Sequence, residues 1–329
     1  MPAKRSVEDQ LAALEGLREG PPEAALEPLR KLLAHRNNYV VAKAADLVAK
    51  FRLTDLVPEL LAAFDRFFKD PIETDPQCWA KNSLARTLAA LECQDAAVFL
   101  RGMRHTQFEP VWGGRSDTAG GLRANCALAL VQCRTLPDAD LLAHLIELLS
   151  DKDKAVRGEV VRAIEQVGSP AAALLLRLRA VLGADEPEVL GACYSGILAI
   201  EGVTAIPWVA RFLAAADDSA AEAALAIAST RSPEAFSALR ERFLDTRSLD
   251  RSEPWFRSVV LSAIALTRQE AALEFLLELA RKKSPDAEAA AEAIVRSMPS
   301  PEVLKRLEEL APENPRLACV LAKHRAARL

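Results

Sequence analysis

Residues 153–168 read DKAVRGEVVRAIEQVG and carry the periodicity of a half-buried helix. The apolar positions follow the i, i+4, i+7, i+8 spacing that places side chains on one helical face; they are Val156, Val160, Ala163, Ile164 and Val167. A small residue such as Ala163 within that face lets a second helix backbone approach closely. The stretch therefore predicts an amphipathic helix that packs against neighbouring helices.

The same register recurs along the chain, which indicates an internal repeat. Matching sets of residues are Leu122, Cys126, Ala129, Leu130 and Cys133; Val189, Cys193, Gly196, Ile197 and Ile200; and Phe256, Val260, Ala263, Ile264 and Thr267. Polar residues followed by proline, as at Ser169-Pro170 and Ser232-Pro233, mark helix starts. We expect first helices to begin near residues 7, 38, 75, 119, 154, 187, 218, 254 and 285. We expect second helices at 22–34, 55–68, 94–102, 138–150, 170–182, 204–215, 233–245, 269–282 and 301–310. The sequence requires no strand.

The stretch 153–168 resembles the first helix of a HEAT repeat, with its Asp, its Val-Arg pair and its Ala-Ile-x-x-Val-Gly ending. The segments beginning at Val57-Pro58 and Ile206-Pro207 are similar to the proline-bearing second helix of that family. The resemblance is to bacterial-type HEAT-like repeats, including those of phycobilisome-lyase-type proteins. It implies an all-α fold, an α-α superhelix (α-solenoid) of about nine two-helix repeats whose second helices line a concave surface. Residues 1–329 would form a single solenoid, with an inserted loop at 104–118 and a capping helix near 315–326.

Composition narrows the functional classes. The 329 residues have a net charge of −4 and a pI near 5.8, which argues against a nucleic-acid partner. The six cysteines are scattered without a C-x-x-C pair, so we predict no metal and no cofactor. Neither a run of about 18 apolar residues nor a signal peptide is evident, so we expect a cytoplasmic protein without a membrane span.

Basic residues recur after the first apolar position of several first helices: Lys81, Arg123, Arg157 and Arg257. One interpretation is a cationic ladder that binds an acidic partner or phosphates. The alternative is a structural ladder in which these cations pair with acidic caps such as Asp153 between neighbouring repeats. Recurrence at the same place in several repeats favours the structural interpretation.

The insertion at 104–118 breaks the repeat and gathers unusual residues. Long loops in a compact array are often functional, and Trp with Arg is typical of binding hot spots. The candidate partner-binding residues are Arg104, His105, Glu109, Trp112, Arg115 and Asp117. In the structural alternative, Asp117 or Thr118 caps the next helix and Gly113-Gly114 makes a turn. His105, Ser116 and Asp117 could suggest a hydrolytic triad, but nothing fixes their geometry, so we predict no catalytic residue.

These observations predict a non-catalytic scaffold or adaptor that binds a partner protein through the concave face and the 104–118 loop. The first alternative is a nucleic-acid-binding enzyme resembling HEAT-like alkylpurine DNA glycosylases, with Trp79, Trp112, Arg115 and Asp117 supplying the pocket. The second is a bilin-lyase-like chaperone, suggested by repeat-level similarity alone.

Overall fold

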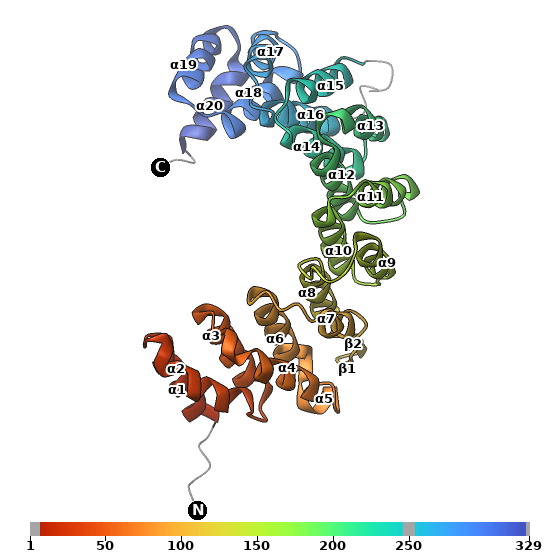
Figure 1. The fold of residues 1–329 in the computed structure, drawn as a ribbon. Helices are drawn as coiled ribbons and strands as arrows, with labels where there is room; N and C mark the ends of the chain where they lie inside the picture. The colour runs from red at the N-terminus through yellow and green to blue at the C-terminus, as the bar shows by residue number, and fades with distance from the viewer. Residues whose placement is uncertain (1–6, 246–253, 327–329) are drawn as a thin grey trace, which may run out of the picture. The chain divides into compact units, whose positions relative to one another are not determined.

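The fold was analysed in a computed structural model that describes residues 7–245 and 254–326. It is an all-α solenoid built from consecutive helix pairs (Figure 1). The first helices are α1 (Val7–Arg18), α3 (Asn38–Phe51), α6 (Trp79–Ala90), α8 (Gly120–Leu130), α10 (Lys154–Val167), α12 (Pro187–Glu201), α14 (Asp218–Ser229), α16 (Pro254–Leu266) and α18 (Asp286–Ser297). The second helices are α2 (Pro22–Leu33), α4 (Val57–Arg66), α7 (Ala96–Met103), α9 (Asp138–Leu148), α11 (Pro170–Leu182), α13 (Ile206–Ala210), α15 (Pro233–Leu244), α17 (Glu270–Arg281) and α19 (Pro301–Leu310). Helix α20 (Pro315–Ala326) follows them.

The chain forms two compact units, residues 1–167 and 168–329. Within unit 1, the first helices α1, α3, α6, α8 and α10 stack in sequence, and α2 packs on α4 in a second layer. Within unit 2, α12, α14, α16 and α18 stack in the same way, and α13 packs on α15. The predicted terminal helix is present as α20, which packs on α18.

The predicted apolar faces form the core of each unit. Val156, Val160, Ala163 and Ile164 are all buried in α10. The small residues at the equivalent position are buried too, namely Ala129, Gly196 and Ala263. Because these side chains are short, successive first helices can pack closely, which stabilises repeats that could not bury their apolar faces alone.

Local capping explains where several second helices begin. The hydroxyls of Ser169, Ser232 and Ser300 accept hydrogen bonds from backbone N–H groups three residues ahead, with proline at the first helical position. Each bond satisfies a donor that the helix itself leaves unpaired. The Ser-Pro signals in the sequence therefore predicted these starts correctly.

The third pair departs from the predicted start at residue 75. A short helix α5 (Pro71–Thr74) and a 3₁₀ turn η2 (Pro76–Cys78) precede α6, which begins only at Trp79. Gln77 and Cys78 adopt left-handed backbone conformations with φ of 60° and 54°. Asp75 nevertheless caps α6, because its two carboxylate oxygens accept hydrogen bonds from the N–H groups of Ala80 and Lys81.

The insertion is not a structureless loop, and the expectation of no strand was wrong. Residues 108–117 form an antiparallel hairpin of β1 (Phe108–Val111) and β2 (Gly114–Asp117), placed between α7 and α8 (Figure 1). The structure thus replaces the expected flexible loop with a small ordered element.

One stretch, Pro187–Ala215, is long and apolar enough in composition to cross a membrane, although the sequence analysis found no such run. In the structure it is not one straight helix. It comprises α12, the 3₁₀ turn η3 (Gly202–Ala205), α13 and the 3₁₀ turn η4 (Arg211–Ala215). Gly202, with φ of 70°, ends α12, and 56% of the most apolar window is buried inside the protein. The apolar character is that of a core repeat.

Candidate functional site

The hairpin has a two-residue turn with Trp112 and Gly113 at its tip. Strand pairing aligns Phe108 with Asp117 and Val111 with Gly114. Gly113 has φ of 87°, a conformation that side-chain-bearing residues rarely adopt, which explains glycine at this place. The turn therefore holds Trp112 at the point farthest from the hairpin base.

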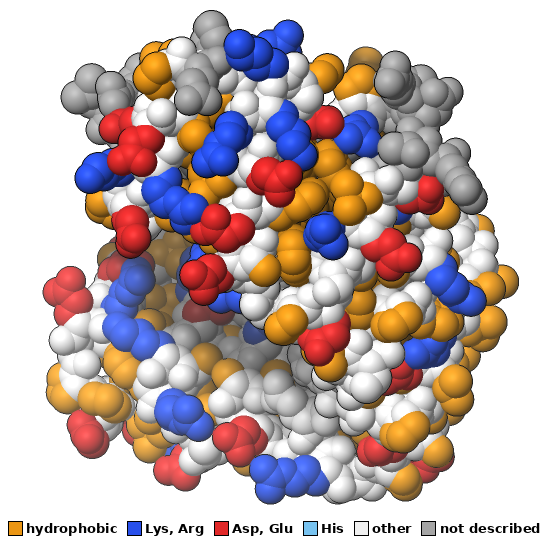
Figure 2. Space-filling model, turned by 90° about the horizontal axis from the view of Figure 1, so that it is seen from above, with side chains coloured by type: hydrophobic (Ala, Val, Ile, Leu, Met, Phe, Trp, Pro, Cys, Tyr) orange, Lys and Arg blue, Asp and Glu red, His pale blue; other side chains and the backbone are white. Residues whose placement is uncertain are grey.

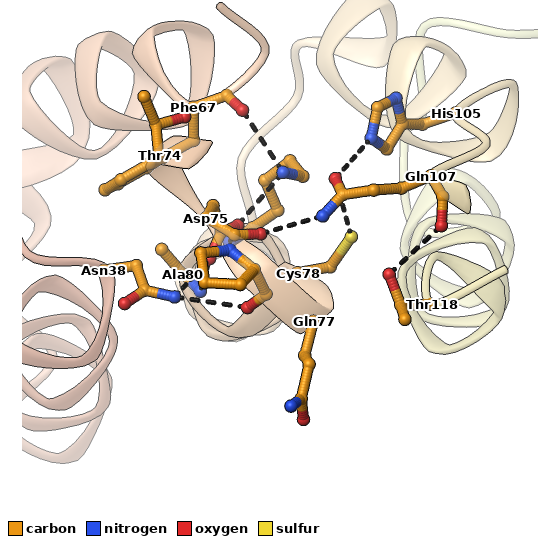
Figure 3. A network of polar contacts seen from close by, with 12 residues as sticks. Asn38, Phe67, Thr74, Asp75, Gln77, Cys78, Ala80, His105, Gln107 and Thr118 are labelled. Atoms are coloured by element: carbon orange, nitrogen blue, oxygen red, sulfur yellow. Dashed lines mark hydrogen bonds and ion pairs between the residues drawn. The ribbon is translucent and has the colours of Figure 1, made fainter. Parts of the chain in front are cut away.

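Gln107 anchors the base of the hairpin to the preceding repeat (Figure 3). Its buried side-chain Nε2 donates to the backbone oxygen of Asp75 at 2.9 Å, as Figure 3 shows. The same Nε2 also donates to Glu109 Oε1 at 2.7 Å. Its Oε1 accepts from the thiol of Cys78 at 3.3 Å. Burial raises the pKa of that thiol to about 11, so it stays protonated and able to donate at neutral pH. Gln107 thus ties the insertion to η2.

Glu109 points inward from β1 and is almost fully buried. Its Oε1 accepts hydrogen bonds from the backbone N–H of Gln77 at 2.6 Å, from Gln107, and from the hydroxyl of Thr118 at 2.6 Å. Burial alone would raise the pKa of Glu109, but these donors hold it below its ordinary value. The carboxylate therefore joins the turn before α6 to both sides of the hairpin.

Asp117 closes the other strand. Its Oδ1 accepts from the N–H groups of Gln107 and Ala119, and its Oδ2 binds the Arg123 guanidinium at 2.7 Å. Burial opposes ionisation, yet the two backbone donors and Arg123 keep the pKa of Asp117 below its ordinary value. Arg123 also binds Asp151 at 2.6 Å and donates to the carbonyl of His105. This cluster connects the hairpin to α8 and to the segment before α10.

A fully buried ion pair lies beneath the hairpin base. Lys81 Nζ is 3.1 Å from Asp75 Oδ2, and neither side chain has any exposed surface. Lys81 also donates to the carbonyl of Phe67, while Asn38 Nδ2 donates to Asp75 Oδ1 at 3.0 Å. The second and third helix pairs therefore meet at this ion pair, and Figure 3 shows Asn38 and Phe67 on either side of Asp75.

The remaining members of the basic ladder make comparable contacts. Arg257 binds Asp286 of the next first helix at 2.8 Å, and Arg157 donates to the carbonyl of Asp151. Asp153, which we expected to pair with this ladder, instead caps α10 through the N–H of Ala155. Its carboxylate lies against Gly120, where an added Cβ would be only 2.6 Å from Asp153 Oδ2. The carboxylates that bind Arg123 are those of Asp117 and Asp151.

The candidate binding residues of the insertion divide into two groups. His105, Glu109 and Asp117 face the interior of the network, and the His105 ring packs on Phe68 with centroids 4.9 Å apart. Burial lowers the pKa of His105. The side chains of Arg104 and Arg115 lie at the surface. Arg104 is 3.7 Å from Glu147. Arg115 donates to the carbonyl of Phe108 at 2.8 Å.

The hairpin presents apolar side chains to solvent at its tip and at its base. Trp112 is fully exposed, and Phe108 and Val111 keep 46% and 49% of their surface exposed. A second exposed aromatic pair, Tyr39 and Trp79, lies at the starts of α3 and α6 with ring centroids 5.5 Å apart. Trp112 was among the predicted binding residues, whereas Phe108 and Val111 were not, although the position of Val111 close to Gly113-Gly114 was a usable signal.

The geometry assembles no catalytic group at the insertion. His105 contacts Gln107, Asp117 is engaged by Arg123, and Ser116 lies within β2 opposite Glu109. The four residues considered for a base-excision pocket do not converge, because Asp117 is engaged at the hairpin base whereas Trp112 is exposed at its tip. Among the described residues, no group of three His, Cys, Asp or Glu side chains is arranged to hold a metal ion.

Comparison with known proteins is informative for this part of the chain. Residues 115–180, which include most of β2, the helices α8, α9 and α10 and most of α11, match the family model of HEAT repeats. This part of the chain carries HEAT repeats. HEAT repeats commonly mediate protein interactions, using the extended surfaces that stacked helix pairs create. No curated protein matches the chain.

Proposed function

We propose that this HEAT-repeat chain is a non-catalytic scaffold that binds a partner protein, and that the hairpin 108–117 is one of its contact elements. The observation that carries the proposal is the exposed Trp112 at the hairpin tip, with Val111 beside it and a half-exposed Phe108 at the base, on an element fixed by buried polar contacts. Several large apolar side chains exposed on one short element are typical of interaction sites. The concave surface of the solenoid is the second element that we propose for partner binding.

A fixed base favours binding because the tip loses little conformational freedom when a partner covers it. Trp112 has the properties of an anchor residue, since a large aromatic side chain inserted in a partner pocket can dominate binding energy. Arg115, on β2, provides a surface cation next to Phe108, whose carbonyl it binds. Together these residues supply an aromatic anchor with a polar neighbour, a common composition of protein interfaces.

Charge distribution favours a protein over a nucleic acid. On the face shown in Figure 2, Lys and Arg side chains are interspersed with Asp and Glu. Two cations considered as phosphate contacts, Lys81 and Arg123, are buried in ion pairs with Asp75, Asp117 and Asp151. Phosphate binding needs clustered, accessible cations.

The test is site-specific photocrosslinking. A benzophenone amino acid at position 112 should crosslink to a discrete protein in lysate of the source organism, whereas the same amino acid at Trp255, another exposed tryptophan, should not. The captured protein is then purified and its affinity measured. Trp112→Ala should weaken binding at least about 30-fold, the effect of removing a hot-spot tryptophan. Equal crosslinking at both positions, or equal affinity of wild type and Trp112→Ala, would refute the role of the hairpin.

A further inference from the structure

A groove in unit 2 has one apolar wall and one acidic wall. It has a volume of about 680 Å³ and lies between α15 and the segment formed by η3, α13 and η4. Val203, Ile206, Pro207 and Ala210 line one side, and Leu213 closes the floor. The opposite side, on α15, carries Glu234 and Glu241. The volume falls within the range of sites that bind small ligands or short peptide segments.

The two glutamates are placed to act together. They are seven residues apart on α15, so they lie on the same helical face, about 10 Å apart along the axis. Both are exposed, and within the described residues neither carboxylate makes an ion pair. Ala238, which also lines the groove, lies between them and is small enough to leave space. This wall therefore offers two available negative charges above an apolar surface.

The cation within the groove belongs to its floor. Arg242 is buried, its Nε donates to the carbonyl of Leu213 at 2.9 Å, and its guanidinium lies 5.5 Å from the centre of the Phe256 ring. These contacts fix α15 against η4 and bury the Arg242 side chain, whereas the two glutamate side chains are exposed. The rim consequently favours a positively charged ligand.

The adjacent groove, between α15 and α17, shows that this charge pattern is not common to every repeat. That groove has a volume of about 450 Å³, and its acidic residues are already paired. Glu274 binds Arg306 at 2.8 Å, and Glu278 binds Lys282 at 2.9 Å. The comparison distinguishes the α13–α15 groove by acidic side chains that lack such partners.

We infer that the α13–α15 groove binds an extended peptide segment in which two basic residues, three positions apart, flank apolar residues. In a polyproline II conformation, residues i and i+3 lie on one face about 9 Å apart, close to the separation of the two glutamates. The intervening apolar side chains would then cover the wall formed by Val203 and Pro207. This site adds a second contact to the protein-binding function and is independent of the hairpin.

The experiment measures fluorescence anisotropy of a labelled peptide, Gly-Lys-Leu-Leu-Lys-Gly, with the full chain at low ionic strength. We expect saturable binding that weakens roughly two- to thirtyfold in the double variant Glu234→Gln/Glu241→Gln, as for two exposed ion pairs. The matched control Glu302→Gln/Glu309→Gln removes two exposed glutamates at the same spacing on α19 and should leave the affinity unchanged. Ala238→Phe, which fills the groove, should abolish binding.

Two further peptides test the chemistry. Replacing both leucines by serine, or both lysines by glutamate, should remove measurable binding. Absence of binding by the original peptide overturns the inference, as does equal loss in the control variant or equal binding of either altered peptide. Trp112→Ala should not affect this peptide, so failure here is distinguishable from failure of the hairpin proposal. Circular dichroism of each variant confirms that the helices remain folded.

Discussion

The buried pair of Asp75 and Lys81 gives a quantitative prediction about the support of the hairpin. At 3.1 Å and an effective dielectric constant of about 20, their attraction is about 5 kcal/mol, which offsets the cost of removing both charges from water. Removing one member of such a pair typically costs about 3–5 kcal/mol, because the other charge remains buried. The two possible removals are not equivalent in this structure.

Lys81→Met leaves Asp75 with three hydrogen-bond donors, namely Asn38 and the N–H groups of residues 80 and 81. We therefore expect Lys81→Met to reduce the free energy of unfolding by about 3 kcal/mol, the lower end of that range. Asp75→Asn leaves the Lys81 ammonium with the carbonyl of Phe67 and directs an amide N–H₂ toward a backbone donor. We expect Asp75→Asn to reduce the free energy of unfolding by about 5 kcal/mol, the upper end of that range. The double variant should cost less than the two single losses added together.

The assay is equilibrium urea unfolding in a background where Trp208 and Trp255 of unit 2 are replaced by phenylalanine. Trp79, four residues from Asp75, then reports on unit 1. The fitted quantity is the unfolding free energy of that transition, because a repeat array need not unfold in one step. This prediction is wrong if both single variants lose less than about 1 kcal/mol of unfolding free energy, or if Asp75→Asn and Lys81→Met lose equal amounts.

Three further predictions concern Trp112, His105 and Gly102. Trp112→Ala should change the free energy of unfolding by less than about 0.5 kcal/mol, since a fully exposed side chain contributes little to folding. The thermal midpoint in scanning fluorimetry should therefore hardly change, and a clear decrease would indicate that Trp112 packs on the protein. Burial lowers the pKa of His105 below its ordinary value of 6.5, so the folded state binds fewer protons than the unfolded state. The contribution of His105 to stability is therefore fully present above pH 6.5 and is lost as the pH falls below that value. His105→Gln should reduce the difference between urea midpoints at about pH 7.5 and 5.5, and an unchanged difference would contradict this. Gly102→Ala should destabilise unit 1 by about 1–3 kcal/mol, because the new Cβ would be 2.3 Å from Cys126 Sγ, and adding Cys126→Ala should recover part of the loss.

The helices were predictable because the information that specifies them is local. In α10 the apolar period and in α11 the Ser169-Pro170 start lie within a few turns of the chain. The repeat then supplied the same signals several times, which compensated for weak copies. The start of α6 was misplaced because Asp75 caps a helix that begins four residues later, across two left-handed residues. No local spacing rule anticipates that geometry.

The buried network was not predictable for the opposite reason. Asn38 and Asp75 are 37 residues apart, and Gln107 is 32 residues beyond Asp75. Gln107 was not among the candidate residues, because its burial depends on contacts with Asp75 and Cys78, which lie far from it in the sequence. The sequence could indicate that 104–118 was unusual. It could not show which of its side chains face inward.

The strand geometry of the insertion clarifies its role. Successive side chains of a strand point to opposite faces, so placing Glu109 inward directs Phe108 outward. An insertion that served only stability would be expected to bury its apolar side chains and expose its charged ones, because burying an unpaired charge is costly. This hairpin does the reverse: Glu109 and Asp117 are buried or half-buried with hydrogen-bond partners, whereas Trp112 is fully exposed and Phe108 and Val111 are about half exposed. The reversed pattern is consistent with an apolar surface whose burial requires another molecule, which is why the crosslinking experiment begins at position 112.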